Sequence, residues 1–154
     1  MKQTPDEQRI AARMAPGVLA LEGFLGRDRR PLGEILAADG AAVARLGLTH
    51  AAVADRLAAA CDAAVAGLGT PVDLGGGLVA VAADAMGRIP CPWGDRRLFP
   101  KGDAELTDTR TDATVRFSAL SVHLVAAHGF YGGLGSRYRL DPALLARLFD
   151  LPGR

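Results

Sequence analysis

Cysteine is scarce in this sequence, which has only Cys61 and Cys91 among its 154 residues. Two cysteines do not make the disulfide framework that holds small secreted domains together, and a chain of this length buries roughly 68–70% of its unfolded surface without one. The N-terminal residues also lack the apolar stretch of a secretory signal peptide. These absences predict a cytoplasmic protein.

An excess of either charge is absent as well. Lysine and arginine together number 18 against 17 aspartates and glutamates, a formal net charge of +1, and the only lysines are Lys2 and Lys101. Nucleic-acid binding depends on a concentrated basic face, because phosphate contacts supply most of the affinity. We therefore expect no nucleic-acid partner.

A long, uniformly apolar run is also missing. Residues 117–136 carry no formal charge over 20 positions, which is long enough to cross a bilayer, but four glycines interrupt the second half of this stretch. A lipid-exposed helix does not tolerate so many glycines in one half of its length. The pattern predicts a helix over 115–127 followed by a glycine loop, and no membrane span.

What the sequence does contain is an ordered series of periodic segments. Helices are predicted over 6–14, 31–46, 49–68 and 141–149, with Thr49 and Asp141 as N-caps and Gly40 as a point where the second helix could break. Strand-like runs occur at 71–74, 78–82, 98–99 and 104–109, with a hairpin turn over 75–77. This order predicts an α+β fold, with N-terminal helices, a small, mainly antiparallel sheet and then C-terminal helices. We expect one globular domain over 1–154, in which 1–16 form a loosely packed N-terminal segment.

Two of the three histidines, His123 and His128, lie in this largely apolar C-terminal region, and Cys91 is held between two prolines. Histidine and cysteine thiolate are the usual zinc ligands, and a catalytic zinc site needs three protein ligands and an open position. On a continuous helix, however, residues five apart point about 140° away from each other. The two histidines can converge only if the helix ends near Ala127 and His128 swings out on the glycine loop.

The same three residues allow two other interpretations. His128 could be a general base near Tyr131 or Ser136, or the partner of a Cys91 nucleophile, in a metal-free active site. Alternatively, His123 bonds a backbone carbonyl or a serine in the core, His128 caps its helix, and Cys91 lies in a structural turn. A shared site predicts that one of the imidazoles lies within about 6 Å of Cys91.

The glycine loop leads into a segment that suits anion binding. Glycine lets a backbone approach a ligand, serine donates a hydrogen bond, and arginine makes fork-shaped contacts to carboxylate or phosphate. The predicted ligand-binding residues are Tyr131, Gly135, Ser136, Arg137 and Arg139. The competing interpretation is that the two arginines pair with Asp141 or Asp150.

Segments 87–93 and 120–142 resemble blocks of bacterial proteins of about this size for which no activity is known, so the resemblance implies no site residue. We therefore expect a small enzyme or ligand binder whose pocket, built on His123, His128 and Cys91, takes an anionic small molecule, with zinc as a candidate cofactor. The alternative is a non-catalytic interaction module that forms a homodimer through its alanine-rich helices.

Overall fold

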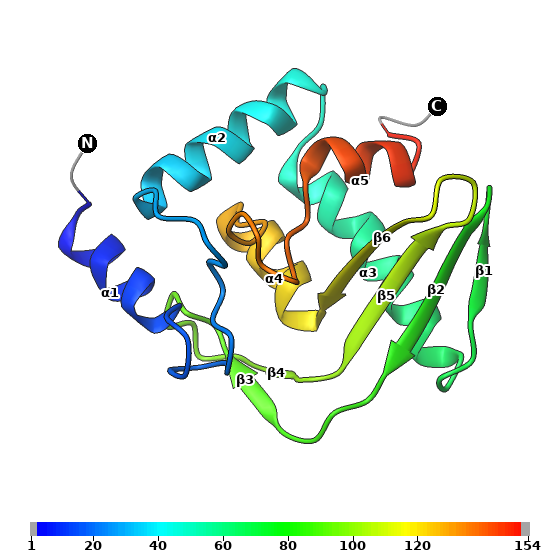
Figure 1. Cartoon of the computed structure of the whole chain (residues 1–154), viewed down its shortest axis with the longest axis horizontal. Helices are drawn as coiled ribbons and strands as arrows, with labels where there is room; N and C mark the ends of the chain where they lie inside the picture. The colour runs from blue at the N-terminus through cyan, green and yellow to red at the C-terminus, as the bar shows by residue number, and fades with distance from the viewer. Residues whose placement is uncertain (1–2, 152–154) are drawn as a thin grey trace.

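The computed structural model describes residues 3–151 and confirms the α+β class. Its elements, in chain order, are α1 (Pro5–Arg13), α2 (Leu32–Arg45), α3 (His50–Ala66), β1 (Val72–Gly75), β2 (Leu78–Ala83), β3 (Arg88–Pro90), β4 (Leu98–Pro100), β5 (Asp103–Asp108), β6 (Ala113–Ser118), α4 (Ala119–His128) and α5 (Pro142–Leu148). Helices lie at both ends of the chain and the strands between them (Figure 1).

The main sheet has four antiparallel strands in the order β1-β2-β5-β6. The chain leaves this sheet after β2, forms the separate β3-β4 hairpin, and returns as β5. Figure 1 shows this hairpin beyond the end of the main sheet, on the side of α1 and α4. The loop between β3 and β4 is therefore placed against helices and not over the sheet.

One face of the sheet carries the larger core. Burial alternates along β5, where Ala104 and Leu106 are covered, and the neighbouring strand β6 buries Val115 and Phe117 on the same side. This alternation is typical of an antiparallel sheet with one packed face. Helix α3 packs against β2 and α4, and it buries small residues such as Ala60 within the chain.

A second, smaller core holds the hairpin in place. It joins Phe99 of β4 and the buried Cys91 to Leu120 and Leu124 of α4, together with Met14 and residues of α2. Through these contacts the hairpin is anchored on the face of α4 from which the histidines project.

The helix predicted over 115–127 is wrong in its first part. Residues 113–118 form strand β6, in which Val115 pairs with Leu106 of β5, and α4 begins at Ala119 after a capping box made by Ser118 and Ser121. The other predicted helices, the predicted strands and the turn over 75–77 are confirmed to within two residues at their ends, and the two predicted N-caps are confirmed as well. Helix α2 continues through Gly40 without a break.

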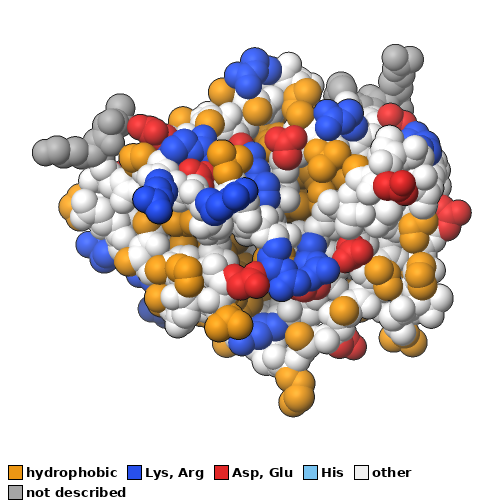
Figure 2. Space-filling model, viewed as in Figure 1, with side chains coloured by type: hydrophobic (Ala, Val, Ile, Leu, Met, Phe, Trp, Pro, Cys, Tyr) orange, Lys and Arg blue, Asp and Glu red, His pale blue; other side chains and the backbone are white. Residues whose placement is uncertain are grey.

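Among the described residues, no helix is long and apolar enough to cross a membrane. The face drawn in Figure 2 carries basic side chains interspersed with acidic ones and with small apolar patches.

Candidate metal centre

A tight turn in the β3-β4 loop brings Cys91 and Asp95 side by side. The Gly94 amide donates a hydrogen bond to the Cys91 carbonyl at 3.0 Å, which closes the turn around Pro92 and Trp93. Proline at the second position favours such a turn, and Gly94 adopts the left-handed backbone that follows it (φ 87°). The Arg13 guanidinium donates to the Pro92 carbonyl and so ties the turn to α1.

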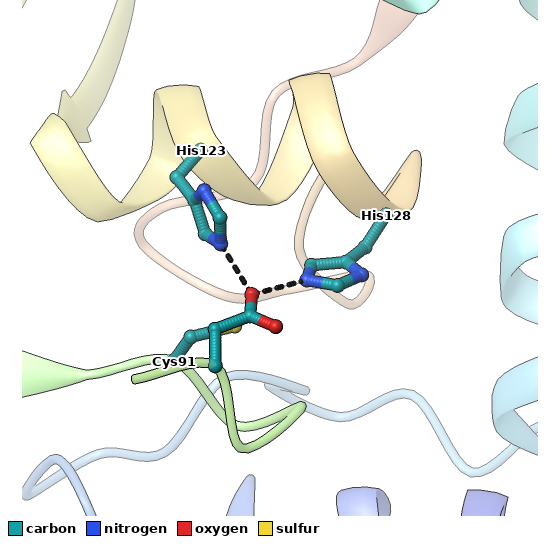
Figure 3. Close-up of side chains that lie close together, drawn as sticks. Cys91, His123 and His128 are labelled. Atoms are coloured by element: carbon teal, nitrogen blue, oxygen red, sulfur yellow. Dashed lines mark hydrogen bonds and ion pairs between the residues drawn. The ribbon is translucent and has the colours of Figure 1, made fainter. Parts of the chain in front are cut away.

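The two histidines come from the last turns of α4. The helix ends at His128, one residue later than predicted, and Gly129 then takes the left-handed conformation (φ 63°). The two rings nevertheless converge, because both side chains reach from the helix toward the β3-β4 loop (Figure 3). Their centroids are 5.3 Å apart at 83°. Trp93 stacks on the His128 ring at 4.3 Å and covers it from one side.

Asp95 lies between the imidazoles. Its Oδ2 atom is 2.6 Å from Nε2 of His123 and 2.8 Å from Nε2 of His128. The expectation that His123 bonds a backbone carbonyl or a serine is therefore wrong. Sequence reasoning missed Asp95 as a site residue, and the only local signal for it is its position four residues after the proline-flanked Cys91.

Cys91 also lies beside Asp95 and the two imidazoles. One ligand atom from each of Cys91, Asp95, His123 and His128 can be chosen so that all four lie within 4.8 Å of one another. The predicted convergence of Cys91 with an imidazole is thus confirmed, and the three residues proposed as metal ligands gain a fourth.

Burial and charge differ sharply among the four side chains. Cys91 is 2% exposed and the imidazoles are 11% and 15% exposed, whereas Asp95 is 34% exposed. Hydrogen bonds from His128 and His123 lower the pKa of Asp95 to about 2. Burial, reinforced by the Asp95 carboxylate, raises the pKa of the Cys91 thiol to about 11, although the Trp93 amide acts in the opposite direction. In the absence of a cation, Cys91 is therefore a neutral thiol at pH 7.

The cluster has the donor atoms of a zinc site and comes close to the dimensions of one. Zinc binds thiolate at about 2.3 Å and imidazole or carboxylate at about 2.0–2.2 Å, so tetrahedral ligand atoms lie roughly 3.3–3.8 Å apart. The most distant pair would have to close by about 1 Å, and the Asp95 Oδ2 atom, at 2.6 and 2.8 Å from the two Nε2 atoms, would have to move away from them by roughly 0.5–0.7 Å. One thiolate, one carboxylate and two neutral imidazoles would also cancel the charge of a divalent ion.

The other predicted site residues lie outside this cluster. Tyr131 is fully buried and its hydroxyl bonds Nδ1 of His50 at 2.8 Å. The Arg139 guanidinium binds Asp39 at 2.6 and 2.8 Å and lies only 3.8 Å from Asp141. The sequence alone does not indicate that His50 is the partner of Tyr131 or that Asp39 is the partner of Arg139.

Arg137 and Ser136 lie near the surface, in the segment after the glycine loop. The Arg137 guanidinium is half exposed and is 3.6 Å from Glu22. Tyr131 and Ser136 line a cavity separate from the four-residue cluster, whereas Gly135, Arg137 and Arg139 do not line it. The structure therefore does not gather the five predicted ligand-binding residues around one space.

Comparison of the chain with protein-family models, with curated proteins and with solved structures finds no match.

Proposed function

We propose that this protein binds one zinc ion through Cys91, Asp95, His123 and His128. The observation that carries the proposal is the meeting of four donor atoms from two separate segments, the β3-β4 loop and the end of α4, within 4.8 Å. Bound there, the ion would fasten the loop to the helix. Four protein ligands complete a tetrahedral site, as in structural zinc centres.

The donor set favours zinc over magnesium or calcium. Magnesium and calcium prefer carboxylate, carbonyl and water oxygens, whereas this cluster offers one sulfur, two imidazole nitrogens and only one carboxylate. A largely buried site also needs its charges balanced. A divalent ion with two anionic ligands meets this requirement.

Burial argues against Cys91 as a nucleophile in a metal-free enzyme. A reactive cysteine is partly exposed and has a lowered pKa, whereas the Cys91 thiol is almost fully covered and an adjacent carboxylate opposes its ionisation. A zinc ion reverses this preference, since a coordinating thiol is deprotonated.

A catalytic zinc centre is a second candidate function, and one observation favours it. Asp95 is 34% exposed, more than any other member of the cluster. Replacement of this carboxylate by water would leave three protein ligands and an open position, the arrangement of zinc hydrolases. Asp95 is thus the residue that separates a structural ion from a catalytic one.

Titration of the chelator-treated protein with Zn²⁺, in competition with a chromophoric chelator, tests the proposal. We expect one ion per chain, and we expect Cys91→Ser and His128→Gln each to weaken binding by about 100-fold or more, because loss of a ligand exceeds the 10–100-fold cost of losing an outer-shell partner. Cys61→Ser is the matched control, since Cys61 lies on α3 outside the cluster. Circular dichroism verifies that each variant is folded.

Unchanged zinc affinity in folded Cys91→Ser and His128→Gln would overturn the proposal, as would the absence of stoichiometric binding. Asp95→Ala separates the two candidate functions. A structural site loses most of its affinity in this variant. A catalytic site retains the ion and gains a water ligand, which the visible spectrum of the Co²⁺-substituted protein reports.

A further inference from the structure

A cavity of about 310 Å³ lies beside the smaller core and is lined by none of the four proposed zinc ligands. The residues that enclose it come from 19–24, 85–89, 101–103, the start of α4 and 130–140. Its walls are mainly apolar and include Phe24, Leu124 and Phe130. Such a lining, with few polar groups, is typical of small-molecule sites.

The mouth of the cavity exposes apolar side chains to water. Leu21 lines the cavity yet is 87% exposed, and the lining residue Ala85 is exposed as well. The cavity therefore opens to solvent beside apolar side chains.

The polar groups of the cavity are not equivalent. Asp103 accepts hydrogen bonds from the Tyr138 hydroxyl at 2.8 and 3.0 Å, and the Arg116 guanidinium is close enough to interact with its charge. The hydroxyls of Ser118 and Ser121 are engaged in the capping box of α4. Lys101, in contrast, has no ion-pair partner among residues 3–151.

We infer that this cavity binds a medium-chain alkyl carboxylate, with the chain among the apolar side chains and the carboxylate at the Lys101 ammonium. Lys101, exposed at the lining, supplies the positive charge. The Asp103 carboxylate lines the same cavity and stays anionic, so the ligand carboxylate must lie on the Lys101 side, away from the Asp103 oxygens that accept from Tyr138. At about 30 Å³ for a group the size of a water molecule, the cavity holds roughly ten such groups. A chain of about that length, such as decanoate, matches this space.

This inference is independent of the zinc proposal. It retains the prediction of an anionic ligand but assigns the ligand to Lys101 and not to the arginines after the glycine loop. The lining includes two of the residues predicted from sequence, Tyr131 and Ser136.

Isothermal titration with decanoate, decanol and decylammonium, each below its aggregation concentration, tests the inference. We expect saturable 1:1 binding of decanoate, weaker binding of decanol and the weakest binding of decylammonium. Lys101→Gln should weaken decanoate binding two- to fivefold, the range for a single solvent-exposed charge pair, and leave decanol binding unchanged. Arg147→Gln, at an exposed position on α5, is the charge-matched control.

A second variant places the ligand in the cavity. Ala85 is exposed at the lining, so Ala85→Trp should keep the fold and obstruct the mouth. We expect it to abolish binding of decanoate and decanol alike. Equal binding of the three ligands, insensitivity to Lys101→Gln, unchanged binding in Ala85→Trp, or no saturable binding would each overturn the inference.

Discussion

Arg139 and Asp39 form an ion pair in the interior of the protein. The guanidinium donates to both carboxylate oxygens, at 2.6 and 2.8 Å, and also to the Gly132 carbonyl at 2.8 Å. The two side chains are only 16% and 7% exposed. Replacement of Arg139 by methionine keeps most of the apolar stem but leaves the Asp39 carboxylate buried without its cation.

The expected loss of stability is large. Removal of one partner from a buried ion pair costs about 3–5 kcal/mol, because the remaining charge is uncompensated. In a domain of this size each kcal/mol lowers Tm by roughly 2–4 °C, so Arg139→Met should lower Tm by roughly 6–20 °C. Arg137→Met is the matched control, because the Arg137–Glu22 pair is about half exposed, and such pairs contribute about 0–1 kcal/mol.

Urea unfolding followed by circular dichroism measures these free energies. The double variant Asp39→Leu/Arg139→Met should recover most of the loss, since two apolar side chains leave no charge buried. The reasoning is refuted if Arg139→Met loses less than about 1 kcal/mol, or if the double variant is as unstable as the single one.

Three further predictions concern acid stability, glycine positions and zinc. Arg30 holds the pKa of Asp28 at about 2, below its ordinary 3.8. The ionised Asp28 carboxylate therefore stabilises the folded protein above pH 4, and this contribution is lost as the pH falls toward 2. Between pH 4 and pH 2, the free energy of unfolding of the wild type should fall by about 2 kcal/mol more than that of Asp28→Asn, as measured by urea unfolding at each pH. Equal losses in the two proteins would contradict this prediction. Gly133→Ala should destabilise by about 1–3 kcal/mol or more in the same assay, because its Cβ would lie 2.1 Å from a backbone oxygen, whereas Gly40→Ala, with open space inside a helix, should stabilise by about 0.5–1 kcal/mol. Zn²⁺ at 100 times its Kd should raise the free energy of unfolding by about 2.7 kcal/mol and Tm by roughly 5–11 °C, and Cys91→Ser should show no such shift by calorimetry.

Much of the fold could be predicted because its signals are local. The caps at Thr49 and Asp141 and the apolar spacing of α3 depend only on neighbouring residues. The sequence pattern assigns the residues of β6 to a helix, because they run directly into the apolar residues of α4 and the strand is defined only by its pairing with β5. Ser118 is the residue that separates the two elements, and its capping role is recognisable only once the strand is known.

The candidate site could be predicted only in part, for the same reason. Cysteine and histidine are rare in this chain, so the sequence alone indicates Cys91, His123 and His128 as ligand candidates. Asp95 is one of many acidic residues, and it becomes a ligand candidate only through the turn that places it beside Cys91. Pairs that are distant in the sequence have no local pattern by which they could be recognised. Asp39, for example, lies 100 positions from its partner Arg139.

X-ray absorption at the zinc edge of the zinc-loaded protein, combined with anomalous diffraction from its crystals, tests the central claim most directly. We predict one ion between the β3-β4 loop and α4, bound by one sulfur at about 2.3 Å and three nitrogen or oxygen atoms at about 2.0–2.2 Å. An ion at another position, or a coordination shell without sulfur, would contradict the assignment of Cys91, Asp95, His123 and His128 as the metal centre.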